Sequence, residues 1–235
     1  MLRPFFQGFV RHIPSQCAVC HSWPTQALCQ HCVETFAQPK ARCKTCALPV
    51  AEGSKQCTNC LSTPPVLDAA FAAVDYAYPW SQLVQEFKFQ EHIGWAKSMA
   101  ALMLSTPWVE PALENADLLI PMPLSVERLK ERGFNQVLVL ANALCAPYPE
   151  KMHTQLLQRI QHTAPLSSMD RKHRQQSVQQ AYAVDRKHTL ALQGKKVVLL
   201  DDVMTTGASL QSAAKALRNA GASHITALIF ARTPH

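Results

Sequence analysis

The sequence predicts an α/β domain that follows a small metal-binding domain. Eight of the nine cysteines lie between residues 17 and 60, and from residue 68 onward short apolar runs alternate with longer amphipathic stretches. This alternation is typical of a mostly parallel sheet flanked by helices. A polar stretch with two adjacent prolines marks the expected boundary, which gives domains of residues 1–63 and 64–235.

Composition and length fit a soluble globular protein. Of the 235 residues, 48% are hydrophobic and 17% are charged. No apolar run approaches the roughly 18 residues that a membrane span needs. Pro4, Arg11 and Pro14 interrupt the amino-terminal stretch where a signal peptide would be continuously apolar. We therefore expect a cytoplasmic protein without membrane insertion.

The cysteines predict two structural zinc ions. They form four pairs of identical C-x-x-C spacing, and two such knuckles complete one tetrahedral zinc site. A disulfide framework fits less well, because a cytoplasmic chain is kept reduced. The eight expected zinc ligands are Cys17, Cys20, Cys29, Cys32, Cys43, Cys46, Cys57 and Cys60.

Spacing alone leaves open which knuckles share an ion. Sequential sharing, which we favour, gives two successive ribbons, whereas sharing between the first and third knuckles gives an interleaved pair. His21 and His31 stand beside ligand cysteines, but eight thiolates already suffice. The spacers of 8, 10 and 10 residues are too short to bury a core, so zinc is expected to supply the folding free energy.

Strands are expected in four apolar runs and helices in three amphipathic stretches. The strand runs are residues 69–78, 117–124, 195–203 and 225–230, and the helical stretches are residues 83–104, 135–144 and 209–221. The net charge of +7 is concentrated in residues 120–200, which hold 12 Lys/Arg and 5 Asp/Glu. Such an excess suits an anionic ligand, either nucleic acid or a polyphosphate metabolite.

The segment after residues 195–200 carries the clearest site pattern. Asp201 and Asp202 come at the end of the expected strand, and residues 205–209 open a helix expected to run to about residue 221. Carboxylates accept hydrogen bonds from ribose hydroxyls, and a helix amino terminus attracts phosphate. The pattern therefore predicts a ribose phosphate site. A nucleoside triphosphatase fits poorly because the chain lacks a G-x-x-x-x-G-K-[ST] loop.

The stretch VVLLDDVMTTGASL resembles the phosphoribosyl diphosphate motif of type I phosphoribosyltransferases. With the cysteine knuckles, FKFQEHIG, PMPLSVERLKERGFNQ and the terminal FAR, nearly the whole chain resembles the ComF (GntX-like) competence proteins. The resemblance implies a double zinc ribbon joined to a type I phosphoribosyltransferase-like domain. It also implies binding of phosphoribosyl diphosphate with magnesium, and a role in the uptake and use of external DNA.

The resemblance also implies site residues. Asp201 and Asp202 would hold the ribose hydroxyls, Lys88 would approach the diphosphate, and Arg132 would line the same cleft. The charge alternation around Arg132 also fits a solvated helix face. The residues expected to wrap the 5-phosphate are Thr205, Thr206, Gly207, Ala208 and Ser209.

A basic stretch from residue 159 to 182 resembles the mobile loop of the family, although Leu166 and Ser177 depart from its pattern. Its cations suit either the diphosphate or the phosphates of single-stranded DNA. No acceptor-specific base is evident, so no catalytic residue is assigned. The alternatives are a base-salvage transferase and a non-catalytic DNA-binding accessory protein, and competence-machinery proteins are further expected partners. The candidate nucleic-acid contacts are Arg159, Arg171, Lys172 and Arg174.

Overall fold

The computed structural model describes residues 15–23, 25–89, 93–160 and 181–234, and the chain divides into two compact units, Met1–Gln38 and Pro39–His235. The first unit holds the first two cysteine knuckles and helix α2 (Gln30–Phe36). Ser15 and Thr25 exchange backbone hydrogen bonds of 2.8 and 2.9 Å, which close the first knuckle into a short antiparallel ribbon.

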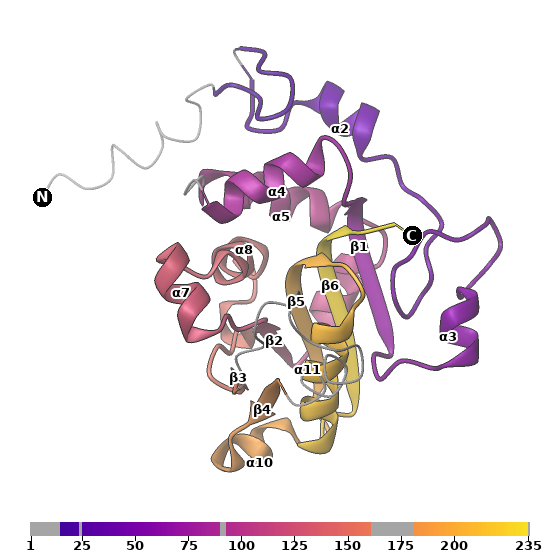
Figure 1. Cartoon of the computed structure of the whole chain (residues 1–235), viewed down its shortest axis with the longest axis vertical. Helices are drawn as coiled ribbons and strands as arrows, with labels where there is room; N and C mark the ends of the chain where they lie inside the picture. Colours follow the sequence, from indigo (N-terminus) through magenta and orange to yellow (C-terminus); the bar gives the residue numbers. More distant parts are fainter. Residues whose placement is uncertain (1–14, 24, 90–92, 161–180, 235) are drawn as a thin grey trace, which may run out of the picture. The chain divides into compact units, whose positions relative to one another are not determined.

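The second unit is built on a four-stranded sheet, and all of its strands run parallel (Figure 1). This arrangement confirms the predicted α/β fold class. Because the strands are parallel, their carboxyl ends lie along one edge of the sheet. The spatial order is β1 (Ala69–Asp75), β6 (His224–Arg232), β5 (Lys196–Met204) and β2 (Leu118–Pro121).

Helices surround this sheet. A second, two-stranded antiparallel sheet consists of β3 (Leu157–Arg159) and β4 (Tyr182–Val184). The expected helix over residues 83–104 is divided into two helices and a 3₁₀ turn. No described helix is long and apolar enough to cross a membrane. The helical elements are α3 (Thr58–Ser62), α4 (Trp80–Phe89), η2 (Ile93–Trp95), α5 (Ala96–Leu104), α6 (Val109–Asn115), α7 (Val126–Arg132), α8 (Gln136–Leu144), η3 (Pro149–Lys151), η4 (Arg186–His188), α10 (Thr189–Leu192) and α11 (Ala208–Asn219).

Alternate residues of the strands face different helices. Val197 and Leu199 of β5 share a buried cluster with the apolar face of α11. In contrast, the ring of Trp80 in α4 packs edge-on against the ring of Phe230 in β6, with the ring centres 6.0 Å apart. Helices α5, α6 and α8 also contact the sheet. The sheet is therefore buried, as its nearly continuous apolar strands predict.

The second cysteine cluster lies in the same compact unit as the sheet. Cys43, Cys46 and Cys60 share one hydrophobic cluster with the strands and α11. The backbone N–H of Ala70 in β1 donates to the Lys44 carbonyl at 2.8 Å. The second ribbon is therefore buried against the sheet.

Candidate functional site

The loop that joins β5 to α11 lies at the carboxyl edge of the sheet. The name β5–α11 loop is used for residues 205–209, which include the first two residues of α11, and all of them except Gly207 are exposed. Gly207 precedes α11 with φ of +81°, and a Cβ there would overlap the side-chain methyl of Met204. Both the backbone conformation and this close approach require glycine. The loop thus presents hydroxyl groups beside a helix amino terminus, which favours an anion.

Two acidic residues precede this loop. The carboxylate of Asp202 is 3% exposed, and its Oδ1 lies 3.1 Å from Lys88 Nζ of α4. Gln136 Nε2, at the start of α8, donates to Asp202 Oδ2 at 2.8 Å. The Asp202 backbone N–H donates to Asp201 Oδ1 at 2.9 Å. Strand β5 ends at Met204, one residue beyond the predicted run of residues 195–203, so both acids lie within the strand.

The two carboxyl groups influence each other. Burial and repulsion from Asp202 raise the pKa of Asp201 to about 8, although the Asp202 backbone N–H, Lys88 and Arg159 act in the opposite direction. Asp201 therefore holds a proton more tightly than an ordinary carboxyl group does. A strongly shifted carboxyl group beside a cation is typical of a functional site.

Arg132 approaches the acid pair from the end of α7. Its guanidinium lies over the ring of Phe89, 4.8 Å from the ring centre, and its Nε is buried without a hydrogen-bond partner among the described residues. Burial lowers the pKa of Arg132, and attraction to Asp202 opposes this shift. Arg132 is therefore a cation with unused hydrogen-bonding capacity at the site.

Arg159 approaches from the hairpin. Its guanidinium lies 5.7 Å from the ring centre of Tyr182, whose hydroxyl is within hydrogen-bonding reach of Ser209 in the β5–α11 loop. Burial raises the pKa of Tyr182, and attraction to Arg159 lowers it. Arg159, which the sequence assigns to nucleic acid, thus lies near enough to Asp201 to act on its carboxyl group.

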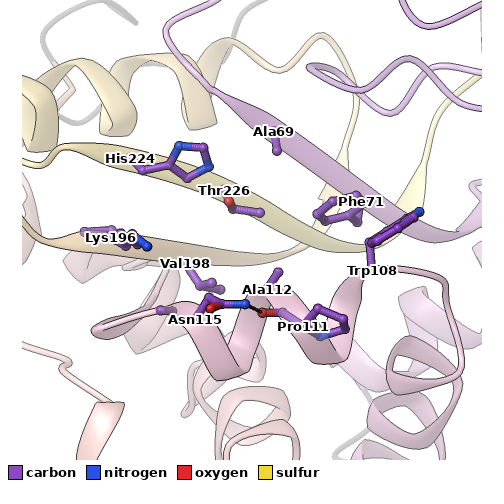
Figure 2. A pocket seen from close by; sticks show the side chains of 12 residues that line it. Ala69, Phe71, Trp108, Pro111, Ala112, Asn115, Lys196, Val198, His224 and Thr226 are labelled. Atoms are coloured by element: carbon purple, nitrogen blue, oxygen red, sulfur yellow. Dashed lines mark hydrogen bonds between the residues drawn. The ribbon is translucent and has the colours of Figure 1, made fainter.

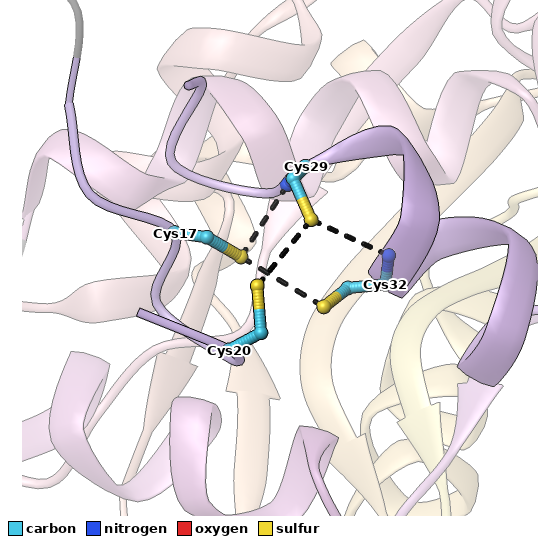
Figure 3. A group of neighbouring side chains, drawn as sticks. All are labelled: Cys17, Cys20, Cys29 and Cys32. Carbon is cyan, nitrogen blue, oxygen red and sulfur yellow. Dashed lines mark hydrogen bonds between the residues drawn. The ribbon is translucent and has the colours of Figure 1, made fainter. Parts of the chain in front are cut away.

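The first cysteine cluster satisfies the geometry of a zinc site. Figure 3 shows the sulfur atoms of Cys17, Cys20, Cys29 and Cys32 converging, with separations of 3.9 Å for Cys17–Cys32 and 3.6 Å for Cys20–Cys29. Four sulfur ligands at about 2.3 Å from zinc require separations of about 3.8 Å. Hydrogen bonds from the side chain and backbone of Ser22 lower the pKa of Cys20 to about 6, which favours the thiolate that zinc requires.

The second cluster has the same form. Cys43, Cys46, Cys57 and Cys60 hold their sulfur atoms within 4.8 Å of one another, and Cys46 and Cys57 are 3.6 Å apart. Both clusters combine successive knuckles, in agreement with the favoured sequential sharing. Each can hold one zinc ion, and no His is needed in either.

Comparisons with known proteins agree with this arrangement. The family model described as the phosphoribosyl transferase domain matches residues 127–235. The chain is 28% identical to DNA utilization protein YhgH of Salmonella typhimurium over 94% of this chain and 98% of that protein. It is 29% identical to competence protein F of Haemophilus influenzae over 84% and 85% of the two chains. The chain is ComF-like: along most of its length it is similar to DNA utilization and competence proteins.

Two further similarities are partial. This ComF-like protein is 36% identical to competence protein ComFC of Bacillus subtilis over 44% of its own length and 39% of that protein. The solved structure of glutamine phosphoribosylpyrophosphate amidotransferase from B. subtilis complexed with ADP and GMP aligns with a TM-score of 0.35 at 19% identity. That alignment covers 57% of this chain and 25% of the amidotransferase.

The structure brings together the predicted residues of several separate segments. Lys88 and Arg132 lie near the acid pair, and the β5–α11 loop follows it directly. The hydrogen bond from Gln136 to Asp202 is visible only in the folded chain. Three of the predicted nucleic-acid contacts, Arg171, Lys172 and Arg174, lie outside the described residues.

A separate hollow of about 360 Å³ lies at the amino ends of the strands (Figure 2). Ala69, Lys196 and His224, the first residues of β1, β5 and β6, line it together with Phe71 and Trp108. None of the predicted site residues is among its lining residues. The hollow is thus at the sheet edge opposite the acid pair, and it does not contribute to the ComF-like site.

Proposed function

We propose that this protein binds phosphoribosyl diphosphate with magnesium at the carboxyl edge of its sheet. The observation that supports this most directly is the acid pair: Asp202 is held by Lys88 and Gln136 directly before an exposed hydroxyl-rich loop at the start of α11. Ribose hydroxyls need carboxylate acceptors, and the 5-phosphate needs a helix amino terminus. Both are adjacent in this structure.

The cations suit the diphosphate. Lys88 and Arg132 come from different helices and both act on the Asp202 carboxylate. Arg132 Nε and Gln136 Oε1 are buried without a hydrogen-bond partner among the described residues, so a bound ligand would satisfy a donor and an acceptor. Magnesium would supply further neutralisation of the diphosphate. Asp201 and Asp202 would hold the ribose once the Asp201 proton is released.

Phosphoribosyl transfer breaks the bond between the anomeric carbon and the diphosphate. A protein that catalyses this step must neutralise the departing diphosphate and orient the ribose. Lys88 and Arg132 are placed for the first task, and the acid pair and the β5–α11 loop for the second. Release of diphosphate that depends on a free purine or pyrimidine base would favour the alternative function of base salvage.

Calorimetric titration with phosphoribosyl diphosphate and magnesium tests the site. Removing both carboxylates in Asp201→Ala/Asp202→Ala should weaken affinity by at least about tenfold, because each charge-assisted hydrogen bond contributes about 1.5–3 kcal/mol. Asp117→Ala is the matched control, since Asp117 binds Lys196 at the opposite sheet edge. Unchanged affinity in the folded double variant would overturn the assignment.

We further propose that the protein acts in the uptake and use of external DNA and binds single-stranded DNA. The names of its relatives support this role. The basic excess of residues 120–200 supports binding of single-stranded DNA.

The salt dependence of binding to a single-stranded oligonucleotide tests this proposal. The log-log slope of affinity against salt should be about −0.7 per phosphate contact, and it should become flatter when four cations are neutralised: Arg159, Arg171, Lys172 and Arg174. A salt-independent affinity would contradict this proposal. Displacement of DNA by phosphoribosyl diphosphate would show that one basic loop serves both anions.

A further inference from the structure

Arg232, at the end of β6, connects the second cysteine cluster to the site. Its side chain is among the largest that are fully buried, with 2% exposure. Nε donates to the Cys46 carbonyl at 2.8 Å, within the second zinc knuckle. Nη1 donates to the carbonyls of Met204, at 2.9 Å, and Thr205, at the start of the β5–α11 loop. One guanidinium therefore joins segments that are more than 150 residues apart in the chain.

Burial of such a cation is costly unless its N–H groups are paired. Burial lowers the pKa of Arg232, while attraction to Cys46 opposes this shift. The bonds to backbone carbonyls compensate for lost hydration, and they depend on the planar fork of the guanidinium. A lysine ammonium is a single point charge, and it cannot contact the Cys46 and Met204 carbonyls in the same geometry.

Met204 continues the connection into the loop. Its carbonyl accepts from Arg232, and its side chain lies against Gly207, where a Cβ would overlap it. The Thr233 backbone N–H also donates to the Met204 carbonyl, at 3.0 Å. Arg232 and the Thr233 N–H therefore both hold the Met204 carbonyl, and the Met204 side chain contacts Gly207.

We propose that Arg232 is a positioning residue through which the second cysteine cluster sets the conformation of the β5–α11 loop. The metal-bound knuckle fixes the Cys46 carbonyl, Arg232 transmits that position to Met204 and Thr205, and the loop is held ready for a phosphate. The effect on phosphoribosyl diphosphate rests on the proposed function, whereas the effect on the loop does not.

Hydrogen exchange of the loop amides in the zinc-loaded chain tests the proposal directly. Arg232→Lys should speed exchange in residues 204–209 by about tenfold, the effect of losing one hydrogen bond to a charged group. Arg218→Lys is the matched control. Arg218 also donates to two backbone carbonyls, those of Ala222 and Ser223, but these lie just before the amino end of β6. Equal exchange in the loop of both folded variants and the unaltered chain would overturn the proposal.

Cobalt in the second cluster provides a spectroscopic readout. In a Cys17→Ser/Cys20→Ser chain, Co²⁺ is confined to the second cluster, and its thiolate absorption bands should shift when phosphoribosyl diphosphate and magnesium are added. Arg232→Lys should abolish this shift and lower affinity by about tenfold. Bands that shift equally in the Arg232→Lys protein would overturn the coupling. If the unaltered protein does not bind phosphoribosyl diphosphate, the proposed function fails, and the exchange measurement alone decides the role of Arg232.

Discussion

The two cysteine clusters have nearly the same ligand spacing but different surroundings. In the first unit, Cys17, Cys29 and Cys32 form a hydrophobic cluster of their own, against which Val19 packs. In the second unit, Cys43, Cys46 and Cys60 are part of the large cluster formed by the sheet and α11. One cluster is therefore a small separate fold, and the other is part of a domain core.

This difference shows that a metal-ligand motif does not determine what the metal stabilises. Zinc at the first cluster can stabilise only the ribbon that surrounds it, because that ribbon has little other apolar burial. At the second cluster, zinc would also stabilise the packing of the strands and α11 against the ribbon. The sequence predicts that both ribbons depend on zinc, but only the second is expected to affect the sheet.

The largest expected effect comes from removing a ligand of the second cluster. Cys60→Ser should abolish one zinc site and leave the main unit largely unfolded, since structural zinc contributes about 10 kcal/mol or more and domain stabilities are about 5–15 kcal/mol. Cys17→Ser should also lose one zinc ion but leave thermal unfolding of the main unit unchanged. Zinc analysis and circular dichroism measure both effects. If the main unit unfolds at the same temperature in both variants, the two clusters do not differ in what they stabilise.

A smaller effect is expected at the ion pairs that attach the second ribbon to β1. Asp75, at the end of β1, lies 2.8 Å from the Arg42 guanidinium and also pairs with Lys40. Burial opposes ionisation of Asp75, but Lys40 and Arg42 outweigh it and hold its pKa below the usual value. Asp75→Asn should lower the free energy of unfolding by about 1–3 kcal/mol, because it leaves Arg42 poorly paired.

Urea denaturation checks this expectation, with Asp185→Asn as the control, since Asp185 and Lys187 form an exposed pair. The measurement is made between pH 6 and 8, where zinc stays bound and where the Asp75 contribution should be fully present, because this range lies above the usual carboxyl pKa of about 4. A loss no larger than that of the control would mean that apolar burial alone attaches the ribbon to the sheet.

The last expected effect is a dependence of stability on pH that comes from Asp201. Because Asp201 has a pKa of about 8 in the folded chain, the native state binds its proton more tightly than the unfolded state does. The free energy of unfolding should therefore fall as the pH rises from about 4 to about 8, by about 1 kcal/mol per pH unit for this group. Measurement between pH 6 and 8 keeps zinc bound, and Asp201→Asn should remove the slope. A persistent slope would exclude Asp201 as its origin.

Local patterns in the sequence predict much of the fold and part of the site. The identical C-x-x-C spacing predicts the zinc ligands, because a tight knuckle places its own thiols together. The apolar runs predict all four strands of the sheet, and the small residues before α11 predict the turn at Gly207. The short strands β3 and β4 were not predicted, since three residues carry no reliable period.

By itself, the sequence determined the metal-binding residues, the mostly parallel sheet and the strand–loop–helix segment that carries the acid pair. Each of these depends on residues close together in the chain. The tertiary structure decided that the second ribbon belongs to the sheet's core, that Lys88 and Gln136 hold Asp202, and that Arg232 reaches both Cys46 and Met204. These contacts join distant segments, and no local spacing or periodicity encodes which distant partner a buried side chain meets.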